Sequence, residues 1–145
     1  MAAGGYAGDV SPEEAMDLLK QNKDAVLVDV RTRPEWTFVG VPDLSELGKE
    51  PVFLEWQSYP TMAPNPEFVA ALTRELEGRG TSKETPVLFL CRSGARSRAA
   101  AMAMTAQGYS QSLNVAGGFE GGPDPNGHRG SIEGWKAIEL PWLQP

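Results

Sequence analysis

Residues that build disulfides and metal centres are almost missing from this sequence. Its 145 residues include one cysteine, Cys91, and one histidine, His128. A single thiol cannot form an internal disulfide and cannot supply a cysteine-based zinc site. His128 lies in a Gly- and Pro-rich stretch, where we expect a solvated loop residue. We therefore expect no metal, no organic cofactor and no catalytic pair that contains a histidine.

Long apolar runs and an excess of basic residues are also missing. No segment approaches the roughly 20 apolar residues of a membrane-spanning helix. The segment Met1–Gly8 has neither the basic part nor the apolar part of a secretory signal. The formal net charge is −6 and the pI is about 4.8, which argues against nucleic acid as the main partner. We expect a cytoplasmic protein with no nucleic-acid and no membrane partner, in a compartment where a lone thiol stays reduced.

What is present predicts one α/β domain. An apolar run without alternation, typical of a strand buried on both faces, lies at Val87–Leu90. The run of branched residues in Ala25–Val30 suits a further buried strand of a parallel sheet, and Leu113–Val115 is expected to be the last strand. Strands that alternate with helices indicate a three-layer architecture, in which a central, mainly parallel sheet of about five strands is flanked by helices. We expect a disordered lead over residues 1–8 and a single domain over residues 9–145. We also expect a short closing helix over Ile132–Ala137.

The candidate chemistry lies in the middle of the chain. An apolar strand ends at Cys91, a short loop with Ser93 and Gly94 follows, and the alanine-rich stretch 95–107 predicts a helix. Ligands of open α/β sheets bind at the carboxyl ends of the strands, where Cys91 is expected. Unpaired N–H groups and the positive end of the helix dipole face a cysteine in this position and favour its thiolate.

Three arginines add positive charge beside this cysteine, although the chain as a whole is acidic. A locally basic loop suits a small anion held by backbone N–H groups. We expect Arg96 to bind the anion or to brace the loop. Arg92 and Arg98 either contact the substrate or only tune the field at the mouth of the site. The alternative for Cys91 is an ordinary buried core cysteine.

The segment Cys91–Ser97, with the sequence CRSGARS, resembles the active-site loop of the rhodanese superfamily, which includes the thiosulfate sulfurtransferases. Other segments resemble further features of that family: Val28–Arg31 with Glu35 (its first buried strand), Asn114–Phe119 (its strand and Gly-Gly-aromatic turn) and Trp135–Pro141 (its ending). The resemblance implies a rhodanese-like fold between Val10 and Pro141. It also implies that Asp29 and Arg31 brace loops through charge-assisted hydrogen bonds.

The resemblance further implies roles for the loop residues. Cys91 is the expected catalytic nucleophile. The expected substrate-binding residues are Arg92, Ser93, Gly94, Ala95, Arg96 and Ser97. Ser93 and Ser97 donate to sulfur or cap the helix. Related cysteine-based phosphatases and arsenate reductases carry a longer loop, with arginine where this chain has Ser97, so the loop length favours sulfur over phosphoryl transfer.

Two departures from the family pattern keep a second interpretation open. The stretch Val39–Leu44 lacks the family's histidine and Gly-Ala pair, and an insert continues to Pro64. A Gly-, Pro- and Asn-rich stretch, 120–131, precedes the end of the chain. Because both change the rim of the expected pocket, a non-enzymatic module that binds a partner or carries sulfur remains an alternative to an enzyme. A cysteine-based phosphatase or arsenate reductase is the less favoured alternative.

The function that these observations predict is sulfur transfer through a Cys91 persulfide. The expected donor is a small anion, thiosulfate or a persulfide, and the acceptor is an external thiol or cyanide. A protein donor or acceptor is also compatible with the sequence. The hypothesis requires that the donor can reach the Cys91 sulfur, so a thiol walled off from solvent would contradict it.

Overall fold

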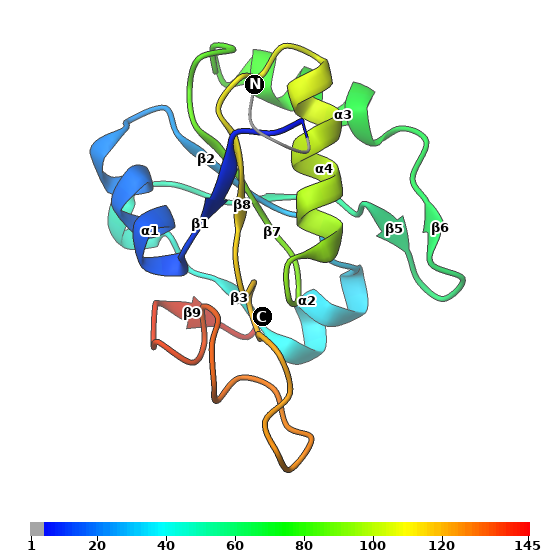
Figure 1. Ribbon diagram of the computed structural model, residues 1–145. Helices are drawn as coiled ribbons and strands as arrows, with labels where there is room; N and C mark the ends of the chain where they lie inside the picture. The colour runs from blue at the N-terminus through cyan, green and yellow to red at the C-terminus, as the bar shows by residue number, and fades with distance from the viewer. Residues whose placement is uncertain (1–4) are drawn as a thin grey trace.

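A parallel sheet of five strands, ordered β1-β8-β7-β2-β4, forms the centre of the computed structural model, which describes residues 5–145 (Figure 1). The sheet strands are β1 (Gly8–Val10), β2 (Val26–Asp29), β4 (Val52–Phe53), β7 (Val87–Leu90) and β8 (Ser112–Val115). The helices are α1 (Pro12–Gln21), α2 (Arg33–Val39), α3 (Phe68–Gly78) and α4 (Ala95–Ala106), with a short 3-10 helix at Ser45–Leu47. The expected α/β class, with a parallel sheet flanked by helices, is confirmed.

Two short antiparallel pairs lie outside the central sheet. They are β3 (Val41–Pro42) with β9 (Trp142–Leu143), and β5 (Gln57–Ser58) with β6 (Ala63–Pro64). The first pair joins the region after α2 to the end of the chain. The second pair forms the green hairpin that projects beside α3 and α4 in Figure 1. Three of these four strands lie in the 39–64 segment, where the sequence departs from the family pattern, and β9 lies at the chain end.

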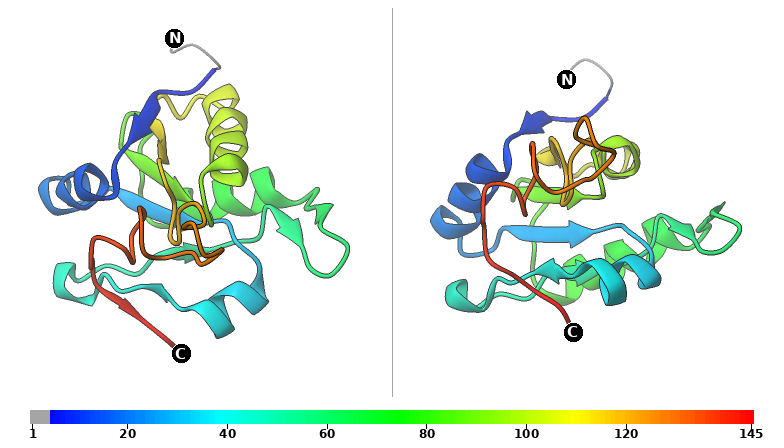
Figure 2. Two further views of the ribbon diagram at one scale, coloured as in Figure 1. Left: turned by 60° about the horizontal axis from the view of Figure 1, so that its bottom comes forward. Right: turned by 90° about the horizontal axis from the view of Figure 1, so that it is seen from below.

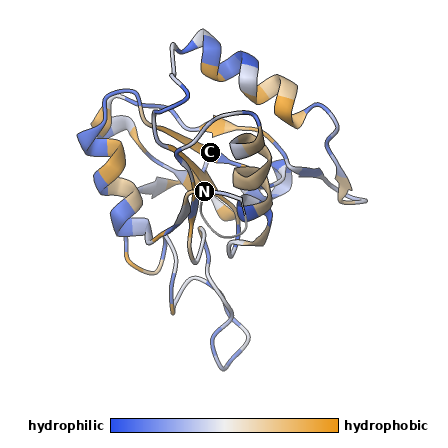
Figure 3. Cartoon of the chain, turned by 45° about the horizontal axis from the view of Figure 1, so that its top comes forward, coloured by the Kyte–Doolittle hydropathy of each residue, from blue (hydrophilic) through white to orange (hydrophobic). Residues whose placement is uncertain are grey.

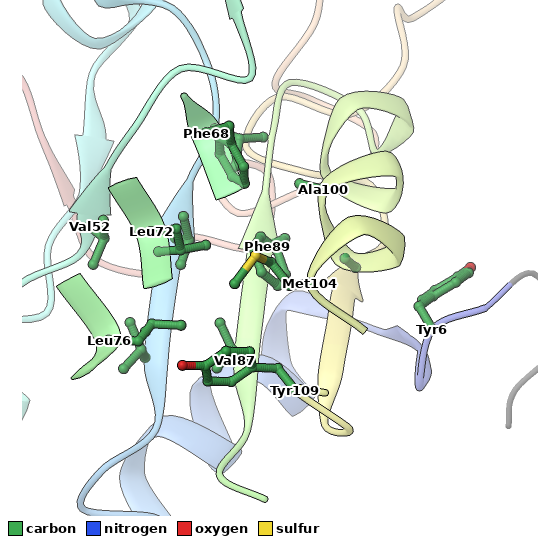
Figure 4. Packing of buried hydrophobic residues seen from close by; sticks show 14 of the residues in the cluster. Tyr6, Val52, Phe68, Leu72, Leu76, Val87, Phe89, Ala100, Met104 and Tyr109 are labelled. Atoms are coloured by element: carbon green, nitrogen blue, oxygen red, sulfur yellow. The ribbon is translucent and has the colours of Figure 1, made fainter. Parts of the chain in front are cut away.

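The central strands are covered on both faces, because successive side chains point in opposite directions. Val28 and Phe89 face the layer made by α3 and α4, where Phe68, Leu72, Leu76 and Met104 pack against them (Figure 4). Leu27 and Leu88 face α1 and the C-terminal segment. Hydrophobic residues gather on the central strands in Figure 3, whereas the helices carry both hydrophobic and hydrophilic residues. Two separate cores, one on each face, therefore hold the sheet.

Local signals in the sequence fix the ends of α1. The Ser11 hydroxyl accepts a hydrogen bond from the Glu14 backbone N–H at 3.1 Å, and the Glu14 carboxylate accepts one from the Ser11 N–H at 2.8 Å. This capping box pairs N–H groups that the helix itself leaves free. It starts the helix at Pro12, which turns Ala15 and Leu19 onto the sheet, where both are buried.

Two expectations about the chain ends need correction. The expected disordered lead, residues 1–8, overlaps the described chain at residues 5–8, where Tyr6 is buried in the core under α4 and β1 begins at Gly8. Residues 1–4 lie outside the described residues, and the single domain over 9–145 stays a prediction. The closing helix over Ile132–Ala137 is wrong, because Gly134 has a φ of 99°, outside the helical region. Within residues 5–145, no helix has the length and apolar character needed to cross a membrane.

A buried ion pair follows the end of β2 and ties it to two neighbouring segments. Arg31 Nη2 donates to Asp29 Oδ2 at 2.7 Å, and both side chains are fully buried. The same Nη2 donates to the Gly40 carbonyl at 2.8 Å. The guanidinium lies 4.3 Å from the centre of the Phe119 ring. Arg31 therefore braces the end of α2 and the turn after β8, in the structural role expected for it.

We predict that Asp29→Asn lowers the free energy of unfolding by about 3–5 kcal/mol, because it leaves the buried Arg31 charge without a counter-charge. Urea denaturation monitored by circular dichroism measures the change. The matched control is Glu75→Gln, which breaks the exposed pair of Glu75 with Arg79. This control is expected to cost no more than about 1 kcal/mol. Equal losses in the two variants would contradict the bracing role of the buried pair.

Candidate active site

The Cys91 sulfur lies beneath the loop that connects β7 to α4. The Gly94 backbone N–H donates to Cys91 Sγ at 3.1 Å, and the Ser97 hydroxyl lies 3.2 Å from the same sulfur. Gly94 caps the start of α4 with a φ of 121°, a conformation that favours glycine. The first N–H groups of α4 lie outside its own hydrogen-bond ladder. The sulfur is thus placed at the N-terminal end of a helix, with two donors beside it.

Cys91 is almost inaccessible in this conformation, since only 1% of its surface is exposed. The loop above it is different: Arg92, Ser93 and Ala95 are exposed, and Gly94 is partly so. This burial conflicts with the requirement, stated from the sequence, that a donor reaches the sulfur. A donor must therefore approach with a slender end group, or the exposed loop must move aside.

The backbone of the strand end is fixed by the turn after β8. The Phe119 N–H donates to the Cys91 carbonyl at 2.8 Å, and the N–H groups of Glu120 and Gly121 donate to the Arg92 carbonyl at 3.0 and 3.1 Å. Gly118 lies so close that a Cβ atom there would stand 2.5 Å from the Cys91 carbonyl oxygen. This contact holds the start of the loop, and the 120–131 insert continues directly from it. Figure 2 shows the insert in orange, in front of the end of the sheet in the left view.

Arg96 pairs with a carboxylate from another helix. Its two terminal nitrogens donate to the Glu35 oxygens at 2.8 and 3.0 Å, which links α4 to α2. Burial alone would raise the pKa of Glu35, but the hydrogen bonds and charge of Arg96, aided by Thr32, lower it to about 2. Of the two roles expected for the Arg96 side chain, this geometry favours bracing the loop. The partner Glu35 was part of the family resemblance, but no pattern in the sequence indicated this pairing.

The remaining loop positions lie near the sulfur but do not all face it. Arg92 and Arg98 are exposed. A cavity of about 270 Å³ beside the loop is lined by Asp9, Ser93, Gly94, Ala95, Arg98, Asn114, Ala116 and Gly117. Its lining does not include Cys91, so we do not assign it as the reaction pocket. Within residues 5–145, no cluster of three or more His, Cys, Asp or Glu side chains could hold a metal ion.

One polar residue of the site was not singled out from the sequence. Asn114 is 5% exposed on β8, and its Oδ1 is within hydrogen-bond distance of the Ser97 hydroxyl. Its Nδ2 donates to Asp9 Oδ1 on β1 at 3.0 Å. An asparagine between Leu113 and Val115, in an otherwise apolar strand, was the available signal. A buried polar side chain in such a strand needs partners, and one of the two partners of Asn114, Ser97, lies beside the sulfur.

We predict that Gly118→Ala lowers the free energy of unfolding by about 2–4 kcal/mol, from the left-handed backbone and from overpacking against the Cys91 and Arg92 backbone. Gly127→Ala is the matched control, because its φ of 79° is similar but a Cβ there meets nothing within 4 Å. We expect that control to lose only about 1–2 kcal/mol. Chemical denaturation compares the two. Equal losses would show that the close approach of Gly118 to the loop does not matter.

We predict a pH dependence of stability from Glu35. Its pKa in the folded protein, about 2, lies below the ordinary glutamate value of 4.5, so its contribution to stability is present above pH 4.5 and is lost as the pH falls toward 2. The Glu35→Gln variant lacks this titrating carboxylate. Its melting temperature therefore falls less than that of the wild type as the pH is lowered from 4.5 toward 2. Glu84→Gln, at an exposed carboxylate, is the control and follows the wild type. Parallel curves for Glu35→Gln and the wild type would contradict the prediction.

Comparison with known proteins finds matches over nearly the whole chain. The family model described as the STR4 middle domain matches residues 7–145. The crystal structure of Rv0390 from M. tuberculosis has a TM-score of 0.86 and 48% sequence identity, over 97% of this chain and 99% of that chain. An uncharacterized protein of Rickettsia conorii is 37% identical over 134 residues, which is 92% of this chain and 95% of its own length.

Two more distant matches have names that refer to sulfur transfer. A protein of Allochromatium vinosum named sulfurtransferase is 27% identical over 111 residues, 77% of this chain and 83% of its own length. The solution structure of the polysulfide-sulfur transferase homodimer from Wolinella succinogenes has a TM-score of 0.57 at 22% identity, over 93% of this chain and 77% of that chain. The second match shows a shared fold alone. Because the family model covers residues 7–145, the chain belongs to the STR4 middle domain family.

Proposed function

We propose that this protein is a rhodanese-like sulfurtransferase that works through a persulfide on Cys91. The observation that carries the proposal is the hydrogen bond from the Gly94 N–H to Cys91 Sγ, at the N-terminal end of α4. N–H groups at a helix start and the helix dipole stabilise an anionic sulfur. The relative named sulfurtransferase in Allochromatium vinosum supports the same chemistry.

The proposed reaction has two half-reactions. The Cys91 thiolate attacks the outer sulfur of thiosulfate, a Cys–S–S bond forms, and the bond to the sulfonate group breaks, so that sulfite leaves with the electron pair. The persulfide then gives its outer sulfur to cyanide, which becomes thiocyanate, or to a thiolate, which becomes a persulfide, and the Cys91 thiolate is restored. Thiol–disulfide chemistry proceeds by the same in-line attack of a thiolate on sulfur. A covalent intermediate of this kind predicts ping-pong kinetics.

The loop supplies the anion-binding groups in this proposal. We assign substrate binding to Arg92, Ser93, Gly94, Ala95, Arg96 and Ser97, chiefly through their backbone N–H groups. The Arg96 side chain contributes by tying α4 to Glu35 rather than by direct contact with the donor. Arg92 lies exposed on the loop and attracts anions. The sequence contains no second cysteine, so the accepting thiol comes from another molecule. We place the reaction in the reducing cytoplasm.

The burial of Cys91 favours one competing function. A thiol with 1% exposure suits a non-enzymatic module that receives sulfur only from a docked partner protein. In the enzyme, by contrast, the exposed loop admits the single terminal sulfur of a small donor. Turnover separates these two functions, because only the enzyme converts thiosulfate and cyanide without a partner.

We predict that incubation with thiosulfate adds the mass of one sulfur atom to the intact protein, and that Cys91→Ser abolishes the gain. Intact-protein mass spectrometry measures the change, and thiocyanate formation after adding cyanide measures turnover. Iodoacetamide labelling of the folded wild type is the control for access, since it must modify Cys91. No added sulfur on a protein whose thiol is accessible would overturn the proposal. Added sulfur without turnover would favour the carrier module.

A further inference from the structure

A chain of side-chain contacts connects the reactive sulfur to the edge of the sheet. The Tyr6 hydroxyl donates to Asp9 Oδ1 at 2.9 Å, and Asn114 Nδ2 donates to the same oxygen at 3.0 Å. Asn114 Oδ1 contacts the Ser97 hydroxyl, which lies 3.2 Å from Cys91 Sγ. The chain thus passes from β1 through β8 and α4 to the end of β7. Ser97 and Asn114 are both buried, so these contacts are shielded from water.

The Ser97 hydroxyl has more acceptors within reach than it can donate to. A hydroxyl carries one proton, and three acceptors lie within reach: Cys91 Sγ at 3.2 Å, the Gly94 carbonyl at 3.2 Å and, closest of the three, Asn114 Oδ1. When the proton points to Asn114, the Ser97 oxygen presents a lone pair to the sulfur. That arrangement suits a thiol, whose S–H can donate to Ser97. When the Ser97 proton points to the sulfur, the arrangement suits a thiolate, which accepts the hydrogen bond.

Asp9 decides which end of the Asn114 amide faces Ser97. A carboxylate only accepts hydrogen bonds, so the Asn114 NH₂ group must face Asp9. The amide oxygen therefore faces Ser97 and can only accept the serine proton. The Tyr6 hydroxyl donates to Asp9 as well, and burial, reinforced by its contact with Asp9, raises the pKa of Tyr6, so that this donor keeps its proton. The orientation of the whole chain is thereby set from the Asp9 end.

We propose that Asn114 is a positioning residue that competes with the Cys91 sulfur for the Ser97 proton, and that Asp9 holds it in the competing orientation. In the resting thiol, Ser97 donates to Asn114. When Cys91 loses its proton to the solvent, the Ser97 hydroxyl turns and donates to the sulfur, as it also does to a persulfide anion. The competition thus limits how much thiolate is present before the donor binds. The inference rests on the proposed function for its biological meaning, but the proton arrangement does not require sulfur transfer.

The charges that face the sulfur stay in place when Asn114 is changed. Arg96 on α4 interacts electrostatically with Cys91, and it is itself balanced by Glu35 on α2 and by Asp29 on β2. Asp9 on β1 reaches the sulfur only through Asn114 and Ser97. Substitution of Asn114 by a neutral residue therefore changes the hydrogen bonds of Ser97 without changing the number of charges.

The test is the rate of Cys91 alkylation by iodoacetamide as a function of pH. Asn114→Ala frees the Ser97 proton for the sulfur, so the rate at mildly acidic pH rises about tenfold, the effect of one hydrogen bond to a charged group. Ser97→Ala removes the donor and lowers the rate by a similar factor. When Asn114→Ala is combined with Ser97→Ala, the Asn114 substitution no longer changes the alkylation rate, because its effect acts through Ser97. Ser112→Ala, two residues earlier on the same strand, is the matched control and leaves the rate unchanged.

Asp9→Asn gives an independent reading from an exposed position. This substitution lets the Asn114 amide turn its NH₂ group to Ser97, which frees the Ser97 proton for the sulfur. The alkylation rate of Cys91 therefore rises when Ser97 is present and does not rise when Asp9→Asn is combined with Ser97→Ala. An Asn114→Ala effect that persists without Ser97, or no effect of either substitution, overturns the proposal. Circular dichroism confirms that each variant is folded. Failure of wild-type protein to take sulfur from thiosulfate would overturn the proposed function and leave this alkylation result standing.

Discussion

The close contact between the turn after β8 and the end of β7 is the constraint on which the site depends. Gly118 approaches the Cys91 and Arg92 backbone more closely than any residue with a Cβ atom could. The N–H groups of Phe119, Glu120 and Gly121 donate hydrogen bonds to the carbonyls of these two residues. These bonds fix the direction in which the chain leaves the strand. The loop must then curl over the sulfur before α4 begins, which brings the Gly94 N–H onto Cys91 Sγ.

Two ion pairs then hold the surroundings of the loop. Arg31 and Asp29 are buried behind it, where the guanidinium lies on the Phe119 ring of the same turn. Arg96 and Glu35 are partly exposed beside it and join α4 to α2. Burial of a charge costs desolvation energy that the paired charge offsets, so each partner depends on the other to stay in place. Here the two pairs keep the start of α4 directed at the Cys91 sulfur.

The burial of Cys91 increases the influence of the hydrogen-bond network next to its sulfur. A sulfur with little access to water depends on the protein for its hydrogen bonds, and every donor or competitor near it then matters more than it would in solution. Gly94 donates through its backbone, which side-chain substitutions leave in place. Ser97 donates through a hydroxyl that can turn, so its neighbours decide where its proton goes. Through Asn114 on β8, the exposed residue Asp9 on β1 is connected to Ser97 and so to the Cys91 sulfur.

The sequence by itself determined the α/β class, the approximate positions of β2, β7, β8 and α4, and the position of Cys91 between a strand and a helix. These features follow from local patterns: apolar runs, an alanine-rich stretch, and a glycine before α4. Only the tertiary structure decided the pairing of Arg96 with Glu35, the burial of the thiol and the contact of Asn114 with Asp9. The chain between Ile132 and Ala137 also departs from its local pattern, because Gly134 packs against Gly121 and the Trp135 N–H donates to the Gly118 carbonyl. The physical reason is the same in each case: strand order and register bring together residues that are far apart in the chain, and no local pattern encodes those neighbours.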